Sequence, residues 1–249
     1  MAMLGRRNKA FGARNPPHAQ ASTLCLLPGL LCDAALWRQQ IEALKGLADC
    51  QVADLSRDDS LAGMAARALA DLPPRFAQAG FSMGGFLAFE ILRQAPERVA
   101  RLALLDTRAS PDDAADLRRG RALLDLATSG PFRAVTEALL PLYLHESRLA
   151  ETALTETLHA MAERLGPEAF ARQQAAIMSR PDSRPLLAEI RCPTPILCGR
   201  QDAAATLAAH EAMAAGTPGA ELVVIEICGH FAPLERPAAV NGAMEGWLE

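Results

Sequence analysis

Short apolar runs alternate along the chain with longer stretches in which apolar residues recur at helical spacing. Apolar runs of this length are typical of strands that are buried on both faces of a sheet. The predicted strands cover residues 23–27, 50–55, 76–81, 99–105, 194–198 and 220–225. The predicted helices between and after them cover residues 34–44, 61–72, 83–94, 204–215 and 237–248. This alternation predicts an α/β fold with a mostly parallel sheet of about six strands and helices on both faces.

The alternation stops between the fourth and fifth predicted strands, where the sequence indicates helices only. Prolines and glycines divide this segment into four predicted helices, over residues 114–127, 132–140, 148–164 and 168–178. We interpret residues 108–188 as a helical cap insertion over the C-terminal edge of the sheet. The core of the fold then consists of residues 22–107 and 189–249. Residues 1–21 are rich in glycine, proline and polar residues, and we expect them to form a disordered N-terminal arm.

Composition narrows the class of protein. The 249 residues, of which 50% are hydrophobic and 22% charged, suffice for one α/β domain with a substantial core. The formal net charge is −4 and no broad basic field is present, which argues against nucleic-acid binding. The sequence has neither an apolar run of transmembrane length nor the apolar stretch of a secretory signal. The six cysteines form no CxxC pair, so we expect reduced thiols that bind no metal. We also expect no other cofactor, no membrane contact and a cytoplasmic location.

A G-x-S-x-G motif lies between the third predicted strand and the helix after it. In Gly80-Phe81-Ser82-Met83-Gly84 the serine occupies the turn from strand to helix, the context that this motif requires. Side chains at Gly80 and Gly84 would collide with the neighbouring strand and helix. The helix that begins at Met83 directs its positive dipole end at Ser82, which favours developing negative charge there. We predict Ser82 as a catalytic nucleophile; the simpler interpretation is a serine in an ordinary strand–turn–helix.

A serine nucleophile needs a positioned base. Five histidines are available: His18, His145, His159, His210 and His230. His18 falls in the predicted arm and His145 and His159 in the insertion. His210 falls in the middle of a helix, where we expect it to be exposed. His230 alone lies in a loop directly after the last predicted strand, at the sheet edge where the nucleophile is expected, and we predict it as the general base.

Two aspartates are candidates for the carboxylate that orients this base. Asp202 follows the fifth predicted strand and gives the chain order Ser…Asp…His. Its alternative role is a helix N-cap, because alanine-rich helical sequence follows. Asp106 ends the fourth predicted strand and would reach the same sheet edge. Chain order favours Asp202, and Asp106 stays open as its rival. Glu235, with Arg236 beside it, is interpreted as a structural residue at a helix start.

Acyl transfer also requires backbone N–H groups that await the oxyanion. One is expected from Met83, the residue after the nucleophile. The second is expected from the loop after the first predicted strand, where the turn Pro28-Gly29 lets the backbone approach a substrate. Leu30 is the predicted donor and Leu31 the alternative.

Together these motifs resemble the α/β-hydrolase fold family, and in particular its capped, soluble bacterial esterase branch. The resemblance covers nearly all of the chain apart from the arm. It implies a catalytic triad and two oxyanion-hole donors, namely Ser82, Asp202 and His230 with Leu30 and Met83. The sequence departs from that branch in reading Pro28-Gly29 where His-Gly is usual. It also has too few residues before the first predicted strand for the antiparallel hairpin with which the family usually opens.

The expected function is hydrolysis of carboxylic esters of small or medium acyl groups through an acyl-enzyme intermediate. The predicted pocket is apolar, with Leu30, Leu31, Met83, Leu139, Leu142 and Tyr143 on its walls. Two alternatives remain open, a carbon–carbon bond hydrolase of the ring-fission-product type and a non-catalytic ligand-binding protein on the hydrolase fold. The expected partner is a small-molecule ester.

A basic cluster in the insertion adds a second possible partner. The cluster consists of Arg118, Arg119 and Arg121. Clusters of this kind are usually solvated helix faces. The sharper interpretation is a docking site for an anionic acyl carrier, as in the pimeloyl-acyl-carrier-protein methyl esterases that the chain distantly resembles.

Overall fold

The computed structural model describes residues 22–249, and the arm predicted for residues 1–21 lies outside this part. Six strands form one sheet in the order β2-β1-β3-β4-β5-β6, and every neighbouring pair is parallel. The strands are β1 (Ser22–Leu27), β2 (Ala48–Val52), β3 (Phe76–Phe81), β4 (Val99–Leu105), β5 (Pro195–Gly199) and β6 (Glu221–Ile225). The predicted fold class is confirmed, with a sheet that is parallel throughout.

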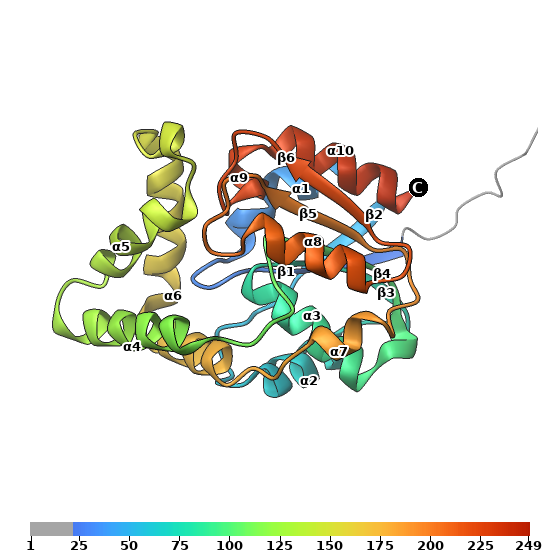
Figure 1. Ribbon diagram of the computed structural model, residues 1–249, viewed down its shortest axis with the longest axis horizontal. Coiled ribbons are helices and arrows are strands. Elements are labelled where there is room, and N and C mark those ends of the chain that lie inside the picture. The colour runs from blue at the N-terminus through green and yellow to red at the C-terminus, as the bar shows by residue number, and fades with distance from the viewer. Residues whose placement is uncertain (1–21) are drawn as a thin grey trace, which may run out of the picture.

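Helices cover both faces of this sheet (Figure 1). One face carries η1 (Ala34–Trp37), α1 (Arg38–Ala43) and α10 (Pro237–Leu248), and the other carries α2 (Leu61–Asp71), α3 (Met83–Gln94) and α8 (Leu207–Gly216). Alternate residues of β1 point into the two cores, Leu24 and Leu26 into the first and Cys25 and Leu27 into the second. This alternation is the period of two that a strand buried on both faces requires.

The segment between β4 and β5 contains no strand and forms the helical insertion. Its helices are α4 (Ala114–Ser129), α5 (Arg133–Tyr143), η3 (Glu146–Arg148), α6 (Thr152–Met178) and α7 (Arg184–Leu187). Helices α4, α5 and α6 stand together at one end of the molecule, on the left in Figure 1. Their shared apolar cluster includes Val135, Leu139 and Phe170, and it also takes in Leu30 and Leu31 of the loop after β1. The insertion therefore packs directly on the loop that was predicted to supply an oxyanion donor.

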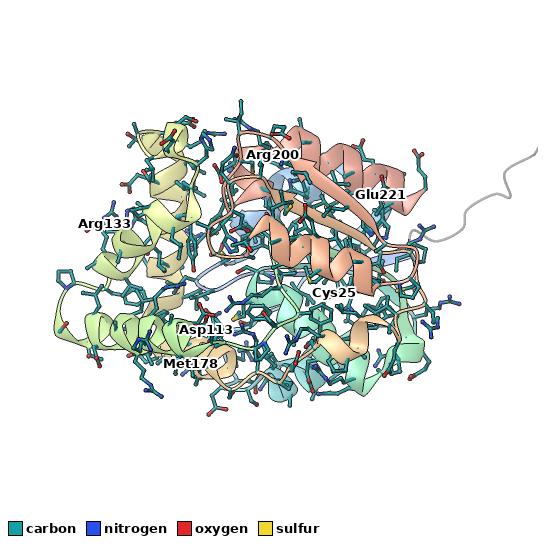
Figure 2. The ribbon with its side chains drawn as sticks, viewed as in Figure 1. Cys25, Asp113, Arg133, Met178, Arg200 and Glu221 are labelled. Carbon is teal, nitrogen blue, oxygen red and sulfur yellow. The ribbon has the colours of Figure 1, made fainter. Side chains whose placement is uncertain are left out.

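Ion pairs tie the insertion helices to one another on their outer side. Arg133 of α5 lies within ion-pair distance of Glu156 and Glu163 of α6, and Figure 2 shows its side chain on the side of the insertion away from the sheet. Helix α4 begins after Asp113, whose carboxylate accepts the backbone N–H of Asp116 at 2.8 Å. This is an N-cap of the kind that stabilises a helix by about 1 kcal/mol.

Several predicted boundaries were wrong, two of them because proline and glycine act differently in their tertiary setting. The helices predicted over residues 148–164 and 168–178 form the single element α6, which kinks at Gly166 (φ 76°, ψ 174°). Helix α5 continues through Pro141 to Tyr143, and the N–H of Leu144 still reaches the carbonyl of Leu140. Strand β2 ends at Val52, before an Asp54 turn in which the carboxylate accepts the N–H of Ser56 at 3.0 Å.

Two smaller helical pieces complete the core. The 3-10 turn η2 (Pro96–Arg98) leads into β4, and α9 (Ala232–Glu235) follows the loop after β6. Within residues 22–249, no helix combines the length and apolar character needed to cross a membrane.

Candidate active site

Ser82 occupies a strained turn between β3 and α3. Its φ of 53° lies in the left-handed region, which costs a residue other than glycine about 1 kcal/mol. A Cβ at Gly80 would lie 2.4 Å from the carbonyl oxygen of Gly84, and one at Gly84 would lie 2.0 Å from that of Leu27. Only glycine allows this approach, so the steric reason given for both glycines holds. The turn lifts the Ser82 side chain out of the sheet at the C-terminal end of β3.

Three of the predicted residues form one chain of hydrogen bonds. The Nε2 atom of His230 lies 2.9 Å from Oγ of Ser82, and its Nδ1 lies 2.8 Å from Oδ2 of Asp202. An ionised carboxylate can only accept, so Nδ1–H donates to Asp202 and Nε2 is left to accept the serine proton. The other oxygen of Asp202 accepts the N–H groups of Ala204 and Ala205, both at 2.8 Å. Asp202 therefore caps a turn and faces the histidine at the same time.

Both the core and the insertion hold the His230 loop in place. Glu235 is buried and its carboxylate accepts the N–H groups of Gly229 at 3.0 Å and of His145 at 2.9 Å. The N–H of His230 donates to the carbonyl of Tyr143 at 2.7 Å, and the Tyr143 ring stacks on the imidazole with centroids 5.0 Å apart. Glu235 has a structural role, as proposed from the sequence, but it organises the preceding loop as well as a helix start.

Asp106, the rival acid, has other partners. It is fully buried, and its two oxygens accept the N–H groups of Gly199 at 2.9 Å and Ala232 at 3.3 Å. Burial and the neighbouring Asp202 carboxylate raise the pKa of Asp106 well above its usual value. A carboxyl group disposed towards the neutral state, and without a bond to His230, is poorly suited to stabilise an imidazolium. The geometry favours Asp202.

His210 was expected to be exposed, and that prediction was wrong. It is completely buried on α8, its Nδ1 donates to the carbonyl of Thr206, and its Nε2 accepts the N–H of Thr107, both at 3.0 Å. Burial lowers its pKa, which favours the neutral ring that these two contacts require. Thr107 in turn donates its hydroxyl to the carbonyl of Ser82 at 2.8 Å. No pattern in the alanine-rich sequence of this helix marks its buried side, so sequence reasoning missed this support for the Ser82 turn.

The two predicted oxyanion donors flank Ser82. Among the described residues, neither the N–H of Leu30 nor that of Met83 donates to a protein group. The N–H of Leu31, the alternative, donates to Oε1 of Gln173 at 3.0 Å and is therefore occupied. A Cβ at Gly29 would lie 3.2 Å from Cβ of Ser82, so the backbone of this loop comes close to the serine. The arrangement favours Leu30 over Leu31.

A cavity of about 100 Å³ opens beside Ser82 and His230, between the sheet edge and the insertion. Leu30, Leu139, Leu142 and Tyr143 line it as expected. Met83 and Leu31 do not, and Leu31 instead lines a smaller apolar space of about 20 Å³. The expectation of an apolar pocket was wrong at one end, where the walls are charged: Arg108, Asp112, Asp116, Arg119 and Arg180. Within residues 22–249 no cluster of three or more His, Cys, Asp and Glu side chains is arranged to hold a metal ion.

The sequence matches a known family of proteins. The model of the α/β hydrolase fold matches residues 57–237, most of the chain. The chain belongs to the α/β-hydrolase fold family. The prediction that it is a hydrolase of this fold is therefore confirmed.

Individual relatives have different activities. A putative carbamate hydrolase RutD of Serratia proteamaculans is 27% identical over 248 residues, covering 92% of this chain and 91% of the relative. A pimeloyl-[acyl-carrier protein] methyl ester esterase of Nitrosomonas europaea is 29% identical over 229 residues, covering 86% and 90%. Among solved structures, a thermophilic esterase of Thermogutta terrifontis with malate bound superimposes with a TM-score of 0.82 at 29% identity, covering 91% and 89%. These relatives share the fold and differ in substrate.

Proposed function

We propose that this α/β hydrolase cleaves carboxylic esters through an acyl-enzyme intermediate on Ser82. The observation that supports the proposal is the hydrogen-bonded series Ser82–His230–Asp202, with contacts of 2.9 and 2.8 Å. A nucleophile, a base and an orienting acid within hydrogen-bond reach form the arrangement that activates a serine. The free N–H groups of Leu30 and Met83 on either side add the site for the developing oxyanion.

The first half of the reaction forms the acyl-enzyme. Ser82 Oγ attacks the ester carbonyl while His230 Nε2 takes the hydroxyl proton, and Asp202 stabilises the resulting imidazolium. Leu30 and Met83 donate to the oxyanion of the tetrahedral intermediate. Collapse of that intermediate breaks the ester C–O bond, and His230 returns the proton to the departing alcohol. Water then attacks the acyl group by the same route and releases the acid.

The size of the cavity limits the substrate. A volume of about 100 Å³ beside Ser82 suits a small or medium acyl group, in agreement with the apolar residues Leu139 and Leu142 on its wall. The substrate we propose is accordingly a small-molecule ester.

An acyl carrier is the second partner that the surface could accommodate. Arg118, Arg119 and Arg121 are exposed on α4, and Arg119 also lines the cavity. A relative named as a pimeloyl-[acyl-carrier protein] methyl ester esterase favours this extension. Replacing all three arginines with glutamate should slow hydrolysis of a carrier-linked ester much more than hydrolysis of a small, neutral ester. Equal effects on both esters would exclude carrier docking at this surface.

The proposed function is tested with a panel of aryl esters of increasing acyl length and, in parallel, a dienol ring-fission product. We expect burst kinetics and turnover of the short esters, no cleavage of the carbon–carbon bond, and loss of activity in Ser82→Ala. Cleavage of the dienol with no ester turnover would assign the carbon–carbon hydrolase instead. A folded wild-type protein that turns over neither substrate class would contradict the proposal.

A further inference from the structure

The charged end of the cavity is built from two aspartates and three arginines of the insertion and of the segment that leads into it. Arg180 is almost completely buried: it pairs with Asp112 at 2.6 Å and donates to the carbonyls of Ser110 and Ile177 at 3.1 and 3.0 Å. Its donors are therefore largely satisfied by the protein itself. Arg180 holds the wall in shape rather than offering a free hydrogen bond.

Arg108, in contrast, retains free donors. Its Nη2 donates to Asp112 at 2.8 Å and to Asp116 at 2.6 Å. Its Nε and Nη1 atoms have no hydrogen-bond partner within residues 22–249, although a guanidinium carries five N–H donors in all. The side chain is 21% exposed and lines the cavity. These unused donors are available to a group in the cavity.

Gln174 is the second unused polar group on this wall. Only 5% of the residue is exposed, it lines the cavity, and its carboxamide makes no hydrogen bond to any described residue. In contrast, the carboxamide of its neighbour Gln173 is fully hydrogen-bonded: its Oε1 accepts the N–H of Leu31 at 3.0 Å and its Nε2 donates to the carbonyl of Leu55 at 3.1 Å. An amide that lies on a cavity wall and has no protein partner can hydrogen-bond a group placed in that cavity.

The two groups lie on the same part of the wall. A Cβ at Gly120 would lie 2.5 Å from Nε2 of Gln174, so the amide rests against α4 at this glycine. Asp116, which holds Arg108, is one turn earlier on the same face of α4, and residues four apart on a helix are about 5–6 Å apart at their Cβ atoms. Gln174 and Arg108 thus lie against neighbouring turns of α4, and both line the same cavity.

The charges on the wall favour an anion. Arg108, Arg119 and Arg180 face only two aspartates that pair with them, which leaves one formal positive charge in excess. Asp106 also lines the cavity, but burial and the neighbouring Asp202 raise its pKa well above its usual value, which disposes it towards the neutral form. An arginine and an amide N–H₂ together are well suited to bind a carboxylate.

We propose that Gln174 and Arg108 form a subsite for a carboxylate that the substrate carries in addition to its ester group. The substrate class is then a small ester with one free carboxylate, such as the half-ester of a short dicarboxylic acid. The inference rests on the proposed ester hydrolysis at Ser82. In this proposal the charged half of the cavity binds the extra carboxylate and takes no part in the chemistry at the triad.

The test compares matched esters that differ only by a carboxylate. One pair places it in the acyl part, 4-nitrophenyl hemiglutarate against 4-nitrophenyl valerate. The other places it in the leaving group, 4-carboxyphenyl butyrate against phenyl butyrate. The measured quantity is the ratio of kcat/KM for the anionic ester to that for the neutral ester, in the wild type and in Gln174→Met, Arg108→Lys and Gly120→Ala. Arg121→Gln is the control, because it removes one exposed positive charge from the same helix outside the cavity.

We expect the wild type to prefer the anionic member of at least one pair. A hydrogen bond to a charged group in a buried site changes binding by roughly 10- to 100-fold, so the ratio should fall about 10-fold or more in Gln174→Met. Gly120→Ala, which pushes the amide aside, should lower it less, and Arg121→Gln should leave it unchanged. Gln174 makes no bond within the described protein, so its replacement should not prevent folding.

Three results would overturn the inference: no preference in either pair, a preference that survives in Gln174→Met and Arg108→Lys, or an equal loss in Arg121→Gln. Each of these is read from active enzyme, so the proposed ester hydrolysis would stand while the subsite fails. Absence of turnover for all four esters in folded wild type would instead contradict the proposed function, and the subsite with it.

Discussion

Gln173 of α6 joins the insertion to the loop that carries the predicted oxyanion donor. The residue is completely buried, its Oε1 accepts the N–H of Leu31 and its Nε2 donates to the carbonyl of Leu55. Leu31 has a φ of 56°, so the hydrogen bond holds a strained backbone next to Leu30. Gln173→Met keeps most of the volume and removes both bonds.

The expected cost follows from the two backbone groups left without partners. Each buried, unpaired group costs about 1–3 kcal/mol, and removal of the glutamine's own polar atoms from the interior offsets part of this. We expect a net loss of about 3 kcal/mol in the free energy of unfolding. For a chain of this size that corresponds to a fall in Tm of roughly 6–12 °C. Activity should also fall by about 10-fold, since removal of a whole oxyanion donor costs about 10²–10³.

The assay is urea unfolding followed by far-UV circular dichroism, together with kcat for a neutral aryl ester. Gln174→Met is the matched control for stability, because it makes the same substitution one residue later at a side chain that bonds no described residue. We expect the control to unfold within about 0.5 kcal/mol of wild type. Equal unfolding midpoints for the two variants would refute the reasoning that Gln173 holds the loop.

Further substitutions test the rest of the site. Asp202→Asn should lower kcat by about 10³–10⁴-fold in steady-state ester hydrolysis, whereas Asp106→Asn should retain most activity; the reverse order would make Asp106 the acid. Because burial depresses the pKa of His210, the unfolded chain takes up its proton first as pH falls. The contribution of His210 to the free energy of unfolding should therefore be fully present above the usual histidine pKa of about 6.5 and be lost as the pH falls below it. In His210→Gln, the free energy of unfolding should fall less steeply with decreasing pH. Gly84→Ala should give little soluble protein, because its Cβ would lie 2.0 Å from a backbone oxygen, and a folded, active variant would contradict that contact.

The sheet and the nucleophile turn were predictable because their signals are local. Strands buried on both faces are continuous apolar runs, and β3 and β4 have the predicted bounds. The glycines around Ser82 reflect clashes with adjacent elements that every chain with this turn must avoid. Chain order then selected His230 and Asp202, which the structure brings together.

The supporting contacts were not predictable, since they depend on which side of a helix is buried. His210 and Gln174 have ordinary polar identities in helical sequence, and only packing makes one a bonded core residue and leaves the other open to the cavity. The charged wall has the same origin. Arg108 pairs with Asp112 four positions later, but Arg180 is 68 positions beyond Asp112 and reaches it only because the chain after α6 packs beside the segment before α4.

The most direct test of the central claim is labelling with a fluorophosphonate, followed by peptide mass spectrometry. We expect one adduct per chain, located on Ser82, and greatly slowed labelling in folded His230→Ala, because the serine then lacks its base. Folded wild-type protein without an adduct on Ser82, or with labelling that does not depend on His230, would contradict that claim.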